Sequence, residues 1–208
     1  MVRAGIALEC ARLARHPELA PPLVAQRLLV SGEDHRHAWH PGFDLIAICR
    51  ALWRRMAYGS REGASTIEQQ IVRTITGRYE HTLRRKLKEI LLATLVGASF
   101  PKEILPPLYL AIAYYGWRMN GYRQACQRLG LRPGSLALDE AAGLVARLKY
   151  PEPRTAPIAR TLQIHRRSKH LLDLYQRHLH DRTYGHLNGT TVRSRPPALG
   201  PAQSVPHP

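Results

Sequence analysis

Two adjacent acidic side chains, Glu33 and Asp34, follow Gly32 in a segment rich in histidine. A carboxylate held among polar groups can act as a general base, because it accepts the proton of a substrate hydroxyl as that oxygen becomes a nucleophile. A structural role is also open, since acids near a helix N-terminus stabilise the helix dipole by ~0.3–1 kcal/mol each. Glu33 and Asp34 are therefore candidate proton acceptors that the rest of the chain must position.

Three histidines, His35, His37 and His40, follow these acids with the spacing His-x-His-x-x-His. Imidazole groups are common zinc ligands, so this spacing raises a metal site as a hypothesis. The segment is expected to be a loop, and it has no Cys and no Glu-x-x-His partner of the kind that dependable zinc motifs contain. We therefore expect these histidines to bind no metal.

A second polar cluster contains Ser65, Thr66, Gln69 and Gln70. Ser65 with Glu68 fits a capping box, in which the two side chains satisfy backbone N–H groups at a helix start. A capping box does not require the two neighbouring amides. Paired glutamines beside a Ser-Thr step offer several donors and acceptors at one helix end, which suits a sugar or a phosphate.

A third cluster places Arg85 and Lys86 four and three residues before Glu89. Such a charged run is commonly a solvated helical face with weak ion pairs between successive turns. Here two cations bracket one carboxylate beside an apolar stripe. That arrangement keeps Glu89 ionised and leaves cations where a phosphate can join them.

The elements that must position these clusters are helices, because apolar residues recur at intervals of three and four and no alternating run is long enough for a strand. We predict an all-α fold in which two helices, Phe43–Tyr58 and Thr82–Val96, bury apolar stripes. The second stripe comprises Leu83, Leu87, Ile90, Leu91, Thr94 and Leu95. Further helices are expected at Pro101–Tyr115, Tyr122–Leu129, Leu138–Leu148 and Thr155–His180.

The chain has 208 residues and a formal net charge of +16. A field of this strength concentrates polyanions, which include nucleic acid, anionic lipid and pyrophosphate. Three scattered cysteines predict no disulfide scaffold, and the sequence predicts neither a signal peptide nor a membrane-spanning helix. We expect an N-terminal helical extension (1–27), one helical domain (28–183) and a disordered, basic, proline-rich tail (184–208).

The order and spacing of the clusters resemble the peptidoglycan glycosyltransferases of glycosyltransferase family 51. Glu33-Asp34 with His40 and Gly42 is similar to the family signature E-D-x-x-F-x-x-H-x-G. The run from Gly63 to Gln70 resembles G-x-S-T-I-T-Q-Q, and the run from Arg85 to Glu89 resembles R-K-x-x-E. The likeness extends from about Leu28 to Arg154 and implies a single lysozyme-like helical domain.

The resemblance implies an enzyme that joins lipid-linked disaccharide units into glycan strands with inversion at the sugar carbon. Glu33 would be the general base that accepts the proton of the acceptor hydroxyl. Glu89 would be the second catalytic carboxylate, near the donor's pyrophosphate. Arg73, Arg85 and Lys86 would neutralise the charge that develops as the pyrophosphate leaves.

The family likeness also implies the partners. They are the lipid-linked disaccharide-peptide precursor, the growing glycan chain and an anionic membrane surface, on the outer (periplasmic) face of the cytoplasmic membrane. A divalent cation, Mg²⁺ or Mn²⁺, is compatible with the pyrophosphate. The remaining substrate-binding residues that the likeness implies are Asp34, His40, Ser65, Thr66, Gln69, Gln70 and Lys102.

The sequence departs from the family pattern at several positions. His37 replaces the aromatic residue of the first motif, and Glu68 replaces the threonine of the second. Arg73 replaces a lysine, which keeps the charge but presents it as a planar fork. A helix near Lys102 should be kinked or restarted, because proline has no N–H group to donate. The departures in the later part of the chain are Gly97, Pro106, Pro107 and Ala111.

Three other functions remain open from the sequence. A basic helical protein can bind nucleic acid through its phosphates, although no known reader motif is present. A divergent member of the family can bind the wall precursor without catalysis. A lysozyme-like site can cleave glycan, but it needs one acid in an apolar cleft, whereas Glu33 has polar neighbours and Glu89 has cationic ones.

Overall fold

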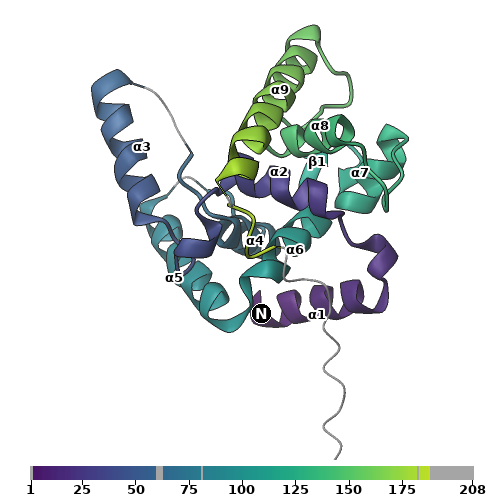
Figure 1. Cartoon of the computed structure of the whole chain (residues 1–208). Coiled ribbons are helices and arrows are strands. Elements are labelled where there is room, and N and C mark those ends of the chain that lie inside the picture. The colour runs from purple at the N-terminus through teal and green to yellow at the C-terminus, as the bar shows by residue number, and fades with distance from the viewer. Residues whose placement is uncertain (1, 60–62, 81, 182, 188–208) are drawn as a thin grey trace, which may run out of the picture.

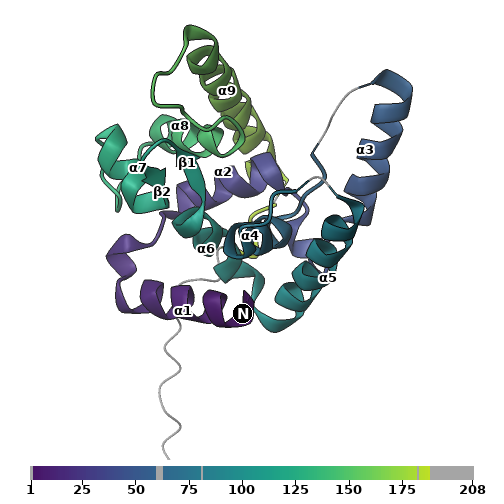
Figure 2. The same cartoon turned by 180° about the vertical axis from the view of Figure 1, so that it is seen from behind.

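The computed structural model describes residues 2–59, 63–80, 82–181 and 183–187. These residues form helices and one two-stranded sheet, which confirms the predicted all-α class (Figures 1 and 2). The helices are α1 (Val2–Arg15), α2 (Leu23–Glu33), α3 (Leu45–Tyr58), α4 (Ile67–Thr76), α5 (Leu83–Ser99), α6 (Leu105–Ile112), α7 (Tyr122–Leu129), α8 (Leu138–Lys149) and α9 (Ile158–His180). The antiparallel strands are β1 (Tyr114–Gly116) and β2 (Met119–Asn120), and short 3-10 turns occupy Pro17–Leu19, His37–Trp39 and Lys102–Ile104.

The core is built around α2, which packs against α6, α8 and α9 (Figure 1). Leu28 and Leu29 of this helix are fully buried, and α4 extends the same core through Ile67 and Ile71. Because α2 ends at Glu33, burial of its apolar residues fixes the position of the first acidic cluster.

The N-terminal segment, which was expected to be a helical extension (1–27), packs on this core. Ile6 of α1 is fully buried, and α1 packs against α4 and α6. The predicted boundary also falls inside α2, where Ala25 and Leu28 are both core residues. Sequence periodicity did not show that α1 would pack against α4 and α6.

The packed domain extends to Leu187, beyond the predicted start of the tail at Tyr184. Tyr184 and Leu187 are both buried, and the Tyr184 hydroxyl is hydrogen-bonded to Ser31 of α2. An aromatic ring supplies enough apolar area to anchor the segment that follows α9. The remainder of the predicted tail, residues 188–208, lies outside the described part of the chain.

The apolar stripes of α3 and α5 face away from the core, contrary to the prediction that both are buried. α3 projects from the rest of the molecule (Figures 1 and 2), and α5 turns Glu89, Ala93 and Val96 inward. A periodic pattern identifies one apolar face of a helix, but it does not identify what covers that face. The exposed apolar residues of the two helices are Leu45, Ile46, Leu52, Trp53, Met56, Tyr58, Leu83, Leu87, Leu91 and Leu95.

The predicted interruption near the prolines is confirmed. A 3-10 turn at Lys102–Ile104 ends where α6 begins at Leu105, and Pro106 and Pro107 occupy its first turn. Proline is tolerated there because the first N–H groups of a helix have no intrahelical acceptor. The predicted continuation to Tyr115 is wrong, since α6 ends at Ile112 and β1 follows.

Two glycines allow the loop after the first cluster to touch the backbone of α5. Gly42 has φ 129°, and a Cβ atom on it would lie 2.3 Å from the carbonyl oxygen of Ala93. A Cβ atom on Gly97 would lie 2.3 Å from the carbonyl oxygen of Pro41. A side chain at position 97 therefore has no space in this backbone arrangement.

Gly97→Ala should lower the free energy of unfolding by ~1–3 kcal/mol, because the added methyl group forces the loop away from α5. Gly143→Ala is the matched control in α8, where a Cβ atom would meet only Arg147 Nη1 at 3.7 Å. That control should stabilise the protein by ~0.5–1 kcal/mol, the usual gain in a helix interior. Chemical denaturation measures both changes, and equal effects of the two substitutions would contradict the close contact.

Candidate functional site

The three sequence clusters meet where the end of α2 faces the N-terminal turn of α4 and the first half of α5. The side chain of Asp34 accepts a hydrogen bond from the backbone N–H of Ile67 at 3.1 Å. Thr66 caps α4 by accepting a bond from Gln69 N, and its hydroxyl donates to the carbonyl of Gly42 at 2.7 Å. These contacts fasten the first cluster to the second.

The predicted capping box of Ser65 and Glu68 is wrong by one residue. Thr66 is the cap, and Glu68 is fully buried and paired with Lys102 instead of reaching back to the helix start. Ser65 is consequently available to other groups. Its hydroxyl oxygen accepts hydrogen bonds from Arg73 Nη2 and Lys86 Nζ, both at 3.2 Å.

Glu33 lies between two cavities. Its carboxylate accepts hydrogen bonds from Gln70 Nε2 at 3.2 Å and from Arg167 Nη2 at 3.0 Å. One cavity, of about 840 Å³, is strongly basic. The other, of about 590 Å³, is lined by Gln70, Arg73 and Tyr109 among others. A carboxylate in this position can contact a ligand on either side.

Glu89 is buried beneath three cations. Its oxygens accept hydrogen bonds from Arg73 at 2.9 and 3.1 Å, from Lys86 at 2.9 Å, and from Arg85. Burial alone would raise the pKa of Glu89, but the hydrogen bonds and charges of Arg73 and Lys86 lower the pKa to about 2. The carboxylate is therefore ionised at neutral pH and holds the cations together.

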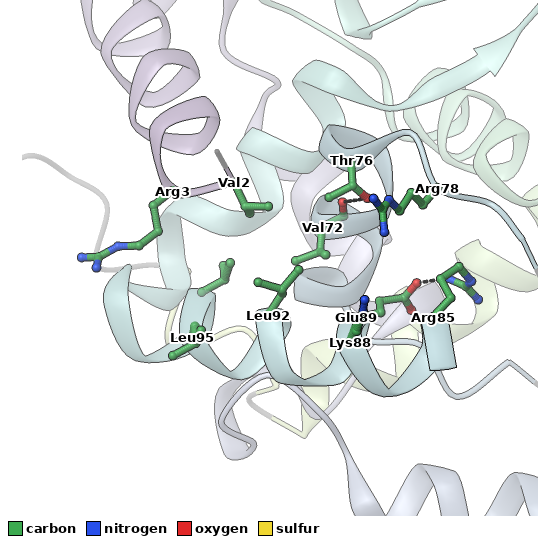
Figure 3. Close-up of a pocket in the computed structure, with 11 residues that line it drawn as sticks. Val2, Arg3, Val72, Thr76, Arg78, Arg85, Lys88, Glu89, Leu92 and Leu95 are labelled. Carbon is green, nitrogen blue, oxygen red and sulfur yellow. Dashed lines mark hydrogen bonds and ion pairs between the residues drawn. The ribbon is translucent and has the colours of Figure 1, made fainter. Parts of the chain in front are cut away.

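The two acids do not line the same cavity, and Arg73 connects them. Arg73 hydrogen-bonds Glu89 and lines both of the cavities that Glu33 borders. Glu89 itself borders a third, largely apolar cavity of about 620 Å³. Figure 3 shows the Arg85–Glu89 pair at one end of this cavity, with Leu92 and Leu95 extending along α5.

The other predicted binding residues fall into two groups. Ser65, Gln69 and Gln70 lie with the Arg73–Lys86 cations or with Glu33, and Gln69 Oε1 accepts a hydrogen bond from Lys86. The second group makes structural contacts instead. His40 bonds the side chain of Asp34, Thr66 bonds the carbonyl of Gly42, and Lys102 pairs with Glu68. Asp34 and His40 are buried, and Lys102 pairs with Glu68 rather than joining the cations around Glu89.

A protein-family model described as Transglycosylase matches residues 11–176, which is most of the chain. The chain belongs to the transglycosylase family. Named relatives include penicillin-binding protein 1A of Vibrio cholerae, 37% identical over 125 residues, which are 59% of this chain and 15% of that protein. The same protein of Aquifex aeolicus is 39% identical over 124 residues (59% and 17%).

Penicillin-binding protein 1A of Neisseria gonorrhoeae is 32% identical over a longer stretch of 154 residues, 73% of this chain and 19% of that protein. The matched part of the chain therefore covers less than a fifth of the length of these three relatives. In the described part of the chain, no helix has the length and apolarity needed to cross a bilayer.

The structure adds Arg167, which the local sequence patterns did not indicate, to the candidate site. Arg167 comes from α9, donates to Glu33 and also bonds the carbonyl of Gly32 at 2.7 Å. Its position three residues after buried Ile164 and four before buried Leu171 places it on the inner face of α9. The sequence shows this spacing, but it does not show that the inner face of α9 contacts Glu33.

Proposed function

We propose that this transglycosylase joins lipid-linked disaccharide units into glycan strands, with Glu33 as the general base. The observation that carries the proposal is the position of Glu33 between a basic cavity and a second polar cavity. A polymerase must hold an acceptor chain and a donor on either side of one proton acceptor. The relatives named penicillin-binding protein 1A support a substrate of the cell wall.

The proposed step is a displacement that inverts the donor sugar carbon. The acceptor hydroxyl oxygen bonds to that carbon while its proton passes to Glu33. The bond from the carbon to the pyrophosphate oxygen breaks, and the lipid pyrophosphate leaves with the electron pair. A positioned base contributes ~10²–10⁴-fold to such a step.

The leaving pyrophosphate is assigned to the cations around Ser65. Arg73 and Lys86 both reach Ser65 Oγ, and Glu89 fixes both side chains. Fixed cations stabilise a departing anion because they need no rearrangement as its charge develops. Glu89 is thus proposed as a positioning residue that acts through Arg73 and Lys86.

The donor set at Glu89 does not fit a divalent cation held by the protein. Three cations, Arg73, Arg85 and Lys86, already pair with its two carboxylate oxygens, and their positive charge would repel a divalent ion. Mg²⁺ or Mn²⁺ at this position would need ligands from the pyrophosphate itself. We therefore assign the charge neutralisation to the arginine and lysine side chains.

The apolar cavity beside Glu89 suits the hydrocarbon chain of a lipid donor. Val2, Val72 and Leu92 line it, with the Arg85–Glu89 pair at one end and Arg3 on the opposite side (Figure 3). A lipid pyrophosphate combines the same two kinds of group, a charged head and a hydrocarbon chain. This match favours a lipid-linked donor over a soluble nucleotide sugar.

The decisive experiment mixes the purified full chain with fluorescent lipid-linked disaccharide precursor and separates the products by length. Glycan polymers are the expected result. Binding of the precursor without polymer would favour the non-catalytic alternative. Salt-sensitive binding of duplex DNA in a parallel titration, with no precursor binding, would favour the nucleic-acid alternative.

We also propose that the exposed apolar faces of α3 and α5 dock on an anionic membrane surface, on the outer face of the cytoplasmic membrane. Both helices lie on the same side of the domain (Figures 1 and 2). Arg50, Arg54 and Arg55 of α3 are exposed beside the apolar side chains. Apolar side chains flanked by arginine suit a lipid interface with negative headgroups.

The double substitution Trp53→Ser with Met56→Ser should reduce co-sedimentation with anionic vesicles at least tenfold, since each buried side chain contributes ~1.5–3 kcal/mol. The matched control, Ile158→Ser with Leu162→Ser, removes two exposed apolar side chains from the start of α9. The control should leave vesicle binding unchanged. Equal losses in the two variants would place the docking surface elsewhere.

A further inference from the structure

Four buried side chains converge where the loop after α2 meets the first turn of α4. They are Asp34, His37, His40 and Glu68, and one potential ligand atom from each lies within 4.8 Å of the others. The side chains of His37 and Glu68 are completely buried, and those of Asp34 and His40 are 4% and 6% exposed. The cluster is separate from the cations that surround Glu89.

The hydrogen bond of His37 to the main chain fixes the orientation of its lone pair. His37 Nε2 lies 3.1 Å from the carbonyl oxygen of Lys102, and a carbonyl can only accept, so Nε2 carries a proton. In the neutral ring, Nδ1 then presents a lone pair 3.4 Å from Asp34 Oδ2 and 3.5 Å from Glu68 Oε1. Electron pairs facing each other in a buried site require a positive charge between them.

Two of these atoms lack a hydrogen-bond partner in the described structure, namely His37 Nδ1 and Glu68 Oε2. Buried polar atoms without a partner cost ~1–3 kcal/mol each, and a bound ion or water at this position would remove that cost. Lys102 Nζ pairs with Glu68 Oε1, the oxygen that faces His37, while Glu68 Oε2 is the oxygen without a partner. With neutral histidines, Asp34, Glu68 and Lys102 together leave one uncompensated negative charge.

His40 orients Asp34 instead of completing the set of free ligands. Its Nδ1 accepts a hydrogen bond from the backbone N–H of Gly42 at 3.2 Å. Nε2 therefore carries the proton and donates to Asp34 Oδ1 at 2.9 Å and to Asp34 Oδ2 at 3.1 Å. A hydrogen bond that aligns a ligating carboxylate is the usual support of a protein metal site.

We propose that Asp34, His37 and Glu68 bind one divalent transition-metal ion of the zinc type. Two ligands that are each ~2.0–2.1 Å from a tetrahedral ion are about 3.3–3.4 Å apart, close to the separations of His37 Nδ1 from the two carboxylates. One imidazole with two carboxylates suits Zn²⁺, whereas Mg²⁺ prefers oxygen ligands and retains water. His37 and Glu68 are also departures of this chain from the motifs that it resembles.

The bound ion would tie the first turn of α4 to the loop that begins one residue after Glu33. This inference does not depend on the proposed reaction, because it concerns binding of the ion alone. Its test uses the full chain after removal of metal with a chelator. Zn²⁺ is then titrated against a chromogenic chelator, and the thermal midpoint is followed with and without Zn²⁺.

The wild-type protein should bind one equivalent of Zn²⁺ at this site, and its thermal midpoint should rise with the ion. His37→Phe and Glu68→Thr, which introduce the residues of the resembled motifs, should each weaken this binding at least ~100-fold. The matched control His35→Phe makes the same substitution two residues earlier, outside the cluster, and should bind as the wild type does. Circular dichroism confirms that each variant is folded.

Two results would overturn the proposal. One is Zn²⁺ binding that is equal in the wild type and in His37→Phe, which would place the ion elsewhere. The other comes from the wild type alone, by ¹⁵N NMR of the imidazole nitrogens of His37. An imidazolium with protons on both nitrogens that does not change on addition of Zn²⁺ would show that a proton supplies the charge. A shift of Nδ1 to the metal-bound range supports the site.

Discussion

Glu33→Gln should lower the rate of glycan polymerisation by ~10²–10⁴-fold, because glutamine cannot accept the proton of the acceptor hydroxyl. The substitution keeps the size of the side chain, and the amide oxygen can still accept a hydrogen bond from Arg167. The thermal midpoint should therefore change little. A time course of polymer formed from fluorescent lipid-linked precursor measures the rate.

The matched control for this substitution is Glu18→Gln, which removes an exposed carboxylate that pairs with His16. It should polymerise at the wild-type rate. Binding of the precursor should survive in Glu33→Gln, since the proposed pyrophosphate contacts are unchanged. Full activity of Glu33→Gln would remove this side chain from the role of base and leave the reaction without a proton acceptor.

Glu89→Gln should destabilise the fold by roughly 2–3 kcal/mol, because three cations would then surround a neutral amide. A fully buried ion pair that loses one partner costs ~3–5 kcal/mol, and the partial exposure of Arg73 and Lys86 reduces this value. Precursor binding should weaken as well, because Arg73 and Lys86 lose the group that fixes them. Chemical denaturation measures the stability.

The stabilisation by Glu89 should also depend on pH. Its pKa is lowered from 4.5 to about 2, so the ionised form is favoured by folding. The difference in free energy of unfolding between wild type and Glu89→Gln should be complete above pH 4.5 and shrink as the pH falls toward 2. Glu9→Gln is the control, since Glu9 forms a single surface pair with Arg12 and should contribute less than ~1 kcal/mol. A difference independent of pH would contradict the pairing.

The sequence predicted most helices and two of the three cations paired with Glu89, because both depend on local spacing. Arg85 and Lys86 lie within one turn of Glu89, so a helix brings them together without help from other elements. Arg73 is different. It reaches Glu89 only because α4 packs along α5, and local spacing contains no information about that contact.

The errors in the predicted fold share a related cause. Leu52 and Trp53 have the periodicity of a buried face, but no neighbouring helix covers that face in the described structure. Tyr184 follows a polar stretch, yet it packs onto α2 through Ser31. In each case the deciding partner is distant in sequence, and composition alone cannot supply it.

The prediction of a metal site from the histidine segment has the same limit, because a residue distant in sequence contributes to the cluster. The spacing of the histidines alone did not favour a metal, because Glu68 lies 31 residues after His37 in the sequence. Folding brings Glu68 from α4 beside His37 and leaves His35 outside the cluster, stacked on His178. A ligand set assembled from two elements has no signature in either segment alone.

The contact of Gly42 and Gly97 with opposing main-chain atoms sets a limit on how this site can vary. The separation between the segment carrying His40 and the helix carrying Glu89 is defined by backbone touching backbone. Rotamer changes cannot adjust such a contact, whereas they readily adjust an interface made of side chains. We therefore expect related chains to differ in the side chains around this contact. The distance between the two backbone segments should stay the same.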